Sequence, residues 1–196
     1  MTTTTLDTSR AKRLKALTHD THEGVDRSIM SAASFADRDR YARFLAVQYL
    51  FHRDIEALYD DIALQGVFPD LATRQRLPLV KTDLADLELD VPDTSEPPLF
   101  VPGAIDLPTA LGWLYVAEGS NMGAAILRKE AAKIGLSDSF GARHLAPAPE
   151  GPAPHWRAFT AALDAVELND EEEQRVADGA NAAFARVQAL VDGRIG

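Results

Sequence analysis

The sequence of 196 residues contains no cysteine and is short of positive charge. Without thiols the chain can form no disulfide, no thiolate metal site and no cysteine nucleophile, so any metal ligand must be histidine, carboxylate or tyrosine. Its 20 lysines and arginines against 30 aspartates and glutamates leave a formal charge of −10, which would repel nucleic acid or an anionic membrane. The sequence has no run of about 18 apolar residues and begins with a polar segment, so we expect a cytoplasmic protein without membrane contact.

The hydrophobic content of 46% is that of an ordinary globular protein, and the length fits one domain. We expect an all-α, single-domain protein with a polar tail over residues 1–9 and a helical domain over residues 10–196. Apolar spacings of three and four predict helices over 14–25, 41–59, 71–89, 109–134 and 156–168, and a last helix from a capping pair at Asn169 and Glu172 to Val191. Pro78 should interrupt or restart the third helix, and repeated prolines predict loops over 91–103 and 147–154.

The first predicted helix carries His22 and Asp26 four residues apart, on one face. Asp26 can therefore accept the far ring proton of His22, and a carboxylate in that position orients the ring and raises the basicity that an iron ligand needs. His19 precedes His22 by three residues, but no further motif completes a divalent-metal site with the two histidines. The alternative is a solvated helix face with an incidental ion pair, which the spacing by itself favours.

The helix predicted over 109–134 contains Gly119 and Gly123, four residues apart. Each glycine costs up to about 1 kcal/mol of helix stability relative to alanine, so something should compensate. One interpretation is close contact with another helix across these glycines. The other is a backbone pressed against a flat ligand, where any Cβ would collide. A planar ligand bound by His22 on one side and covered by the glycines on the other would account for both features.

Six sequence blocks also resemble a known family: LKALTHDTHEGVD from Leu14, RYARFLAVQYLFHRDIEALY from Arg40, FPDLATRQR from Phe68, LGWLYVAEGSNMGAAIL from Leu111, FGARHLA from Phe140 and LDAVELNDEEE from Leu163. Together they cover nearly the whole chain, which resembles the bacterial haem oxygenases of the iron-acquisition type. The resemblance implies a haem oxygenase-like helical bundle with haem sandwiched between a proximal and a distal helix. It also implies an oxidoreductase that cleaves haem to biliverdin, CO and ferrous iron with O₂, haem being both cofactor and substrate.

The resemblance assigns roles to individual residues of this sequence. His22 is the expected iron ligand, Asp26 its carboxylate partner, and Gly119 and Gly123 the distal positions over the haem. The remaining residues are expected to hold ordered water that reaches the distal pocket (Gln48, His52 and Trp156), to contact the propionates (Lys15 and Tyr115), or to contact haem elsewhere on the distal helix (Ser120 and Asn121). His19 has no role in this pattern. The alternatives are core packing for the water-holding residues and a solvated surface lysine for Lys15.

Lys15, Tyr115 and Glu130 favour cleavage at the α-meso carbon, because a β- or δ-cleaving branch of the family differs at these positions. The sequence has no flavin or nicotinamide fingerprint, so electrons must come from an external reductase or ferredoxin. We expect a monomer. Two other functions stay open at this point: a non-catalytic haem carrier or sensor that uses His22, and a helical interaction domain without a cofactor.

Overall fold

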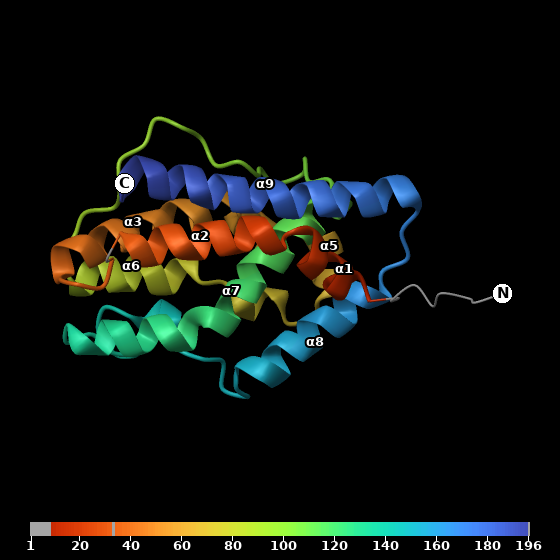
Figure 1. The fold of residues 1–196 in the computed structure, drawn as a ribbon. Coiled ribbons are helices and arrows are strands. Elements are labelled where there is room, and N and C mark those ends of the chain that lie inside the picture. Colours follow the sequence, from red (N-terminus) through yellow and green to blue (C-terminus); the bar gives the residue numbers. More distant parts are fainter. Residues whose placement is uncertain (1–8, 33, 196) are drawn as a thin grey trace.

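The computed structural model describes residues 9–32 and 34–195, and the described chain is helical, as predicted. The elements in order are α1 (Arg10–Leu17), α2 (His19–Ser31), α3 (Arg38–Asp54), α4 (Glu56–Tyr59), α5 (Ile62–Val67), η1 (Leu71–Arg74), α6 (Leu77–Asp86), α7 (Leu107–Lys133), η2 (Arg143–Leu145), α8 (Pro152–Ala165) and α9 (Asp170–Arg194). In Figure 1, α9 lies along α2 and α3, and the second half of α7 runs beneath them beside α8. Of the predicted polar tail over residues 1–9, only Ser9, the N-cap of α1, lies among the described residues. No helix of the described part is both long and apolar enough to span a bilayer.

Two predicted helices are interrupted where a residue leaves helical geometry. The helix expected over 14–25 is divided at Thr18, whose hydroxyl donates to the Leu14 carbonyl at 2.8 Å and whose ψ of 6° ends α1 before α2 begins. The helix expected over 41–59 likewise stops at Asp54, and Ile55 separates it from α4. A hydroxyl that bonds back to the preceding turn competes with regular helix geometry, and a period-based prediction does not detect it.

Prolines and capping residues fall mostly where the sequence indicated. The region expected as a helix over 71–89 is a 3₁₀ turn followed by α6, which restarts with Pro78 in its first turn. The loop was predicted to extend to residue 154, but it is shorter, because α8 already begins at Pro152. A proline is tolerated in the first turn of a helix, where its missing N–H has no helical acceptor. The capping box of Asn169 and Glu172 is confirmed and begins α9.

Helices α7 and α9 cross in direct backbone contact, the most extensive contact between two helices of the described chain. A Cβ built on Gly112 would overlap the carbonyl oxygen of Val176, and one built on Gly179 would overlap the carbonyl oxygen of Thr109. Neither overlap could be relieved by a side-chain rotation, since the neighbouring atoms are backbone. The two glycines therefore hold the first half of α7 in the centre of the core.

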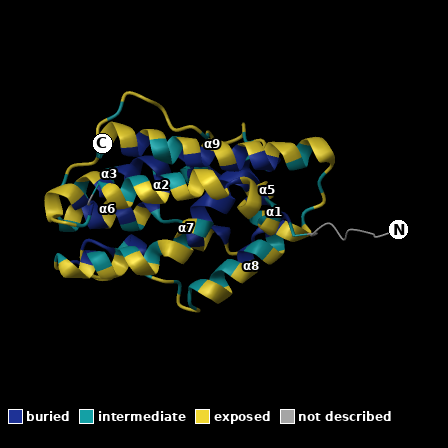
Figure 2. Ribbon diagram, viewed as in Figure 1, coloured by how far each residue is buried: buried dark blue, intermediate teal, exposed yellow. Residues whose placement is uncertain are grey.

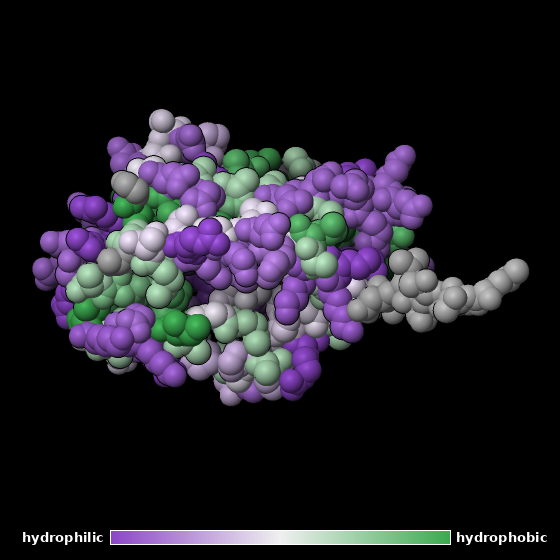
Figure 3. Space-filling view, viewed as in Figure 1, coloured by the Kyte–Doolittle hydropathy of each residue, from purple (hydrophilic) through white to green (hydrophobic). Residues whose placement is uncertain are grey.

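The second half of α7 leaves the core. Residues 110–118 are all buried, whereas none of residues 119–130 is (Figure 2). Helix α2 is similarly exposed, with Val25 as its one buried residue, and it packs on α9 rather than on α7. Large apolar side chains stay exposed on these two helices, including Met30, Met122 and Ile126. Figure 3 shows apolar side chains gathered below α2, over the second half of α7. The fold thus leaves two helices with faces that the other described residues do not cover.

Candidate functional site

His22 lies on α2 with its side chain 57% exposed, and its ring stacks on Phe184 of α9 at a centroid distance of 5.3 Å. Its Nε2 atom is 3.3 Å from Oδ2 of Asp26, so the predicted pair forms and the carboxylate faces one ring nitrogen. His19 makes a similar pair with Glu23 at 3.4 Å, which shows that the spacing alone does not distinguish the two histidines. The contact with Phe184 does distinguish them, because it fixes the plane of the His22 ring against the core.

Gly119 and Gly123 are not packing glycines. Outside the backbone of α7 and among the described residues, a Cβ on Gly123 would meet no atom within 4 Å, and one on Gly119 would touch only the Trp156 ring at 3.5 Å, an ordinary contact distance. Gly112, on the same helix, has its backbone pressed against α9 instead. The helix–helix interpretation of the two glycines is therefore wrong for Gly119 and Gly123, and the close contact lies at Gly112. The described chain therefore leaves the backbone at Gly123 uncovered and that at Gly119 covered only by the Trp156 ring.

Tyr115 connects the distal helix with the junction of α1 and α2. Burial raises the pKa of Tyr115, and a hydrogen bond with the Thr18 side chain opposes that shift. The Tyr115 ring lies 5.6 Å from Trp156, which covers Gly119 from the side of α8. Lys15 is exposed on the last turn of α1. The structure thus brings Tyr115 and Trp156 together and places Thr18, four residues before His22, beside them.

Two other predicted residues of α7, Ser120 and Asn121, lie where this helix leaves the core. The Ser120 hydroxyl donates to the Ala117 carbonyl at 2.6 Å, so it is bonded within its own helix. Asn121 is half-buried. Both follow Gly119 directly, where α7 leaves the core.

The two predicted water-holding residues of α3 differ in burial. Gln48 is half-buried, whereas His52 is only 5% exposed and its Nδ1 atom has no hydrogen-bond partner among the described residues. Burial is the main cause that lowers the pKa of His52 to about 3, and electrostatic interactions with His144 and Arg76 lower it further. His52 is therefore a neutral imidazole at physiological pH, with a buried nitrogen that is free to hold water.

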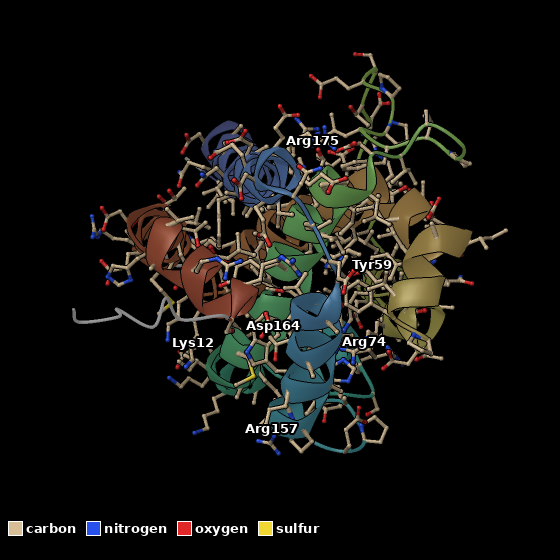
Figure 4. The ribbon with its side chains drawn as sticks, turned by 90° about the vertical axis from the view of Figure 1, so that its right-hand side faces the viewer. Lys12, Tyr59, Arg74, Arg157, Asp164 and Arg175 are labelled. Carbon is tan, nitrogen blue, oxygen red and sulfur yellow. The ribbon has the colours of Figure 1, made fainter. Side chains whose placement is uncertain are left out.

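A buried ionic cluster that the sequence prediction missed lies directly before Gly119. Glu118 is buried and accepts hydrogen bonds from Arg74 Nη1 at 2.8 Å and from the Tyr59 hydroxyl at 3.2 Å. His155 Nε2 lies 3.6 Å from the same carboxylate. Figure 4 shows Tyr59 and Arg74 near each other beside α8. The available signal was Glu118 itself, a charge in an otherwise apolar stretch of helix.

The Glu118 cluster determines where α7 leaves the core. A buried carboxylate is stable only when it is paired and hydrogen-bonded, and here the partners come from η1, α4 and α8. Arg74 also contacts the face of Phe159, at 5.8 Å from the ring centroid, and its Nη2 donates to the His155 carbonyl. Gly119 is therefore held in place by the residue before it.

The fold and the site define an all-helical protein with an exposed histidine helix and an opposing glycine-faced helix, and comparison with known proteins agrees. The sequence model of the Heme oxygenase family matches residues 8–94 and 102–192. Heme oxygenase PigA of Pseudomonas aeruginosa is 45% identical over 183 residues, which are 93% of this chain and 91% of that protein. The chain belongs to the haem oxygenase family and is an oxidoreductase that degrades haem.

Solved structures agree with this assignment. The NO- and CO-bound haem oxygenase of Neisseria meningitidis superposes with a TM-score of 0.89 at 39% identity, over 96% of this chain and 92% of that one. Haem oxygenase 2 of Chlamydomonas reinhardtii, solved without haem, superposes with a TM-score of 0.73 over 95% and 97% of the two chains. At 20% identity the second likeness concerns the fold alone.

The Glu118 cluster makes a prediction about stability and pH. The carboxylates of Glu118 and Glu150 raise the pKa of His155 against an opposing effect of burial. A histidine whose pKa is raised by folding contributes stability that is complete below its unfolded value of about 6.5 and is lost as the pH rises through the folded value. The extra unfolding free energy of the wild type over His155→Gln, measured by urea titration, should therefore shrink as the pH is raised from 6 to 9. The matched control is His19→Gln on exposed α2, and a difference that stays constant with pH would contradict the prediction.

Proposed function

We propose that this haem oxygenase holds its substrate between α2 and the second half of α7, with His22 on the iron and Gly119 and Gly123 against the opposite face of the porphyrin. The observation that carries the proposal is that, among the described residues and outside the backbone of α7 itself, a Cβ added at Gly123 would meet no atom within 4 Å and one added at Gly119 would meet only the Trp156 ring, although both glycines cost helix stability. The exposed imidazole on α2, and the apolar side chains left uncovered on both helices, support the same site. The carrier or sensor alternative would use the same residues but leave haem intact.

Bound haem supplies both the iron that activates O₂ and the ring that is oxidised to biliverdin, with release of CO and ferrous iron. The chain contributes a histidine ligand, which pushes less electron density onto the iron than a thiolate would. Asp26 holds the ring of His22 in one orientation, and Phe184 supports it from α9. The electrons come from an external reductase or ferredoxin. We place the reaction in the cytoplasm, in a monomer that releases iron for the cell.

Protons reach the distal side through water in this proposal. With glycine at 119 and 123, no acidic or basic side chain lies directly over the iron, so no residue there can act as a general acid. Gln48, His52 and Trp156 hold the water instead, and the buried unpartnered nitrogen of His52 supports this role. Ser120 and Asn121 contact the haem edge from the same turn of α7.

The first prediction from this site concerns Gly123→Ala. An added methyl group meets nothing in the protein, so the unfolding free energy without haem should stay the same or rise by up to about 1 kcal/mol. Against haem it should collide, weakening binding or turnover by about 1–3 kcal/mol, roughly 5- to 150-fold. Urea unfolding of the haem-free protein and haem titration measure the two effects.

Gly112→Ala is the control for this prediction, because it adds the same group to the same helix. It should lower the unfolding free energy by about 1–3 kcal/mol or more through contact with α9. Unchanged haem binding and turnover in Gly123→Ala would place the ligand elsewhere.

The second prediction concerns His22→Ala, which removes the proposed iron ligand. Haem turnover should be lost, and added imidazole should restore part of it, because the vacated position can take an external ring. The measurements are the Soret band and bilin absorption after addition of haem, reductant and O₂. His19→Ala should leave both unchanged. Full turnover of His22→Ala without imidazole would contradict the role of His22 as iron ligand. A stable oxy-haem spectrum in the wild type would instead indicate a haem carrier or sensor.

The third prediction concerns the site of ring cleavage. Lys15 and Tyr115 are proposed to contact the propionates and so to set the in-plane rotation of haem, which chooses the carbon presented to oxygen. Glu130 forms an ion pair with Lys133 at 2.6 Å on the outer part of α7 and presents no positive charge to a rotated propionate. The product should therefore be biliverdin IXα, identified by chromatographic separation of the isomers. A predominance of the β or δ isomer would contradict the proposed orientation.

A further inference from the structure

The first turn of α8 is tied to α7 through the ring of His155, which lies between two carboxylates. Nδ1 is 2.7 Å from Oε1 of Glu150, and Nε2 is 3.6 Å from Oε2 of Glu118. Glu118 is buried on α7, whereas Glu150 precedes α8 and is exposed. The His155 side chain is only 12% exposed, so little water competes for its nitrogens. His155 therefore links a buried carboxylate with an exposed one.

Only the protonated form of His155 suits both contacts. An ionised carboxylate accepts hydrogen bonds and donates none, so a ring nitrogen that faces one should carry a proton. A neutral imidazole has a single N–H and would direct its lone pair at the other carboxylate. In agreement, Glu118 first and then Glu150 raise the pKa of His155 against the opposing effects of burial and of the Arg74 charge.

The other groups of this cluster are themselves paired or neutral. Arg74 donates to Glu118 through Nη1 at 2.8 Å and to Asp70 through Nε at 2.9 Å. The Tyr59 hydroxyl stays neutral, because burial and the Glu118 charge raise its pKa. His155 is the group of the cluster whose ordinary pKa lies nearest neutral pH. The charged and titratable groups around it are Glu118 of α7, Asp70 and Arg74 of η1, Tyr59 of α4, Arg76 before α6, Glu150 before α8 and Arg157 of α8.

The residue that follows His155 is Trp156, and the residue that follows Glu118 is Gly119. A Cβ built on Gly119 would lie 3.5 Å from the Trp156 ring. Two consecutive residues of α8 thus meet two consecutive residues of α7. The charged contact between His155 and Glu118 fixes the distance at which the Trp156 ring covers Gly119.

Arg74 supports the same arrangement through the backbone and through a second ring. Its Nη2 donates to the carbonyl of His155 at 3.2 Å, and its guanidinium lies 5.8 Å from the centre of the Phe159 ring. Phe159 in turn stacks on Trp156 at a centroid distance of 5.7 Å. Both the ring and the carbonyl of His155 are therefore held by the Glu118–Arg74 ion pair.

We propose that His155 is a positioning residue of the haem site: as an imidazolium clamped between Glu118 and Glu150, it holds α8 against α7 and so keeps the Trp156 ring over Gly119. The ring then sets the width of the site at Gly119. When His155 loses its second ring proton, a lone pair faces a carboxylate and the start of α8 is released from α7. The inference rests on the proposed position of haem against Gly119.

Fluorine NMR of the haem-free protein tests the placement of Trp156 without the reaction. The chain has two tryptophans, so incorporated fluorotryptophan gives two signals, and Trp156→Phe assigns them. The Trp156 signal should shift as the pH is raised from 6 to 9, with a midpoint above the ordinary histidine value of about 6.5. Trp113 packs against Phe51 and Phe100 instead and is the internal reference, whose signal should not shift.

Three variants assign this titration to His155. His155→Gln should abolish it, because glutamine has no proton to lose in this range. Glu150→Gln keeps an acceptor for Nδ1 but removes a charge that favours the imidazolium, so the midpoint should move to lower pH. Glu167→Gln, at an exposed position just beyond the other end of α8, is the matched control and should leave the midpoint unchanged. A Trp156 signal that does not titrate, or that titrates equally in His155→Gln, would overturn the proposal.

Turnover of the haem-loaded protein measures the consequence for the reaction. At pH 6, His155→Gln should have a kcat about three- to tenfold below the wild type, with haem affinity within about twofold. As the pH rises to 9 the wild type should approach the variant, and in Glu150→Gln this decline should occur at lower pH. A kcat ratio that stays constant with pH, accompanied by a lower unfolding free energy of His155→Gln, would show a merely structural role and overturn the proposal.

These measurements also distinguish the inference from the function on which it rests. A haem-free protein whose Trp156 signal follows His155 as expected, but which does not cleave haem, would contradict the proposed function and leave the role of His155 in placing Trp156 intact. A protein that cleaves haem and whose Trp156 signal ignores both His155→Gln and Glu150→Gln would contradict the role of His155 alone.

Discussion

The backbone contact between α7 and α9 is the constraint on which the rest of this structure depends. Gly112 and Gly179 let the two helices approach until backbone faces backbone, which buries residues 110–118 of α7. Because α7 continues as one helix, its second half must project beyond the core and face α2 across an uncovered region. The glycines proposed to face haem are therefore positioned by Gly112, about two turns before Gly119 and about three turns before Gly123 in the same helix.

The core beneath the second half of α7 contains buried charged groups that are paired. Glu118 joins η1, α4 and α8 at the point where α7 becomes exposed, and Asp83 joins α6 to η2. Arg76 lies between the two groups: its pKa is lowered by burial and raised by Glu118, and its charge in turn acts on His52. Buried ions with a full set of partners specify geometry more than they add stability. Here Glu118 fixes the point where α7 becomes exposed, and Asp83 fixes the ring of His144.

This arrangement divides the proposed chemistry between the helices. Helix α2, supported by α9, offers an imidazole, whereas α7 offers backbone without side chains. In the proposed site Gly119 and Gly123 present no titratable side chain, so the proposal assigns proton delivery to water held by buried groups such as His52 of α3. The likeness to haem oxygenases extends over nearly the whole chain, so it includes the elements that carry these supporting residues.

The sequence by itself determined the helical class, the restart at Pro78 and the capping of α9 by Asn169. It also showed which helices contain histidines and glycines, the glycines at a cost in helix stability. Helical periodicity, missing donors and capping side chains are local properties, and a histidine or glycine in a helix is visible without its neighbours. Only the tertiary structure decided which glycine packs and which faces outward, because Gly112 and Gly123 look alike until α9 is placed against one of them. It alone also joined Asp83 to His144 and Glu118 to Arg74, since hydrogen bonds between residues tens of positions apart depend on how the helices pack and not on the spacing along the chain.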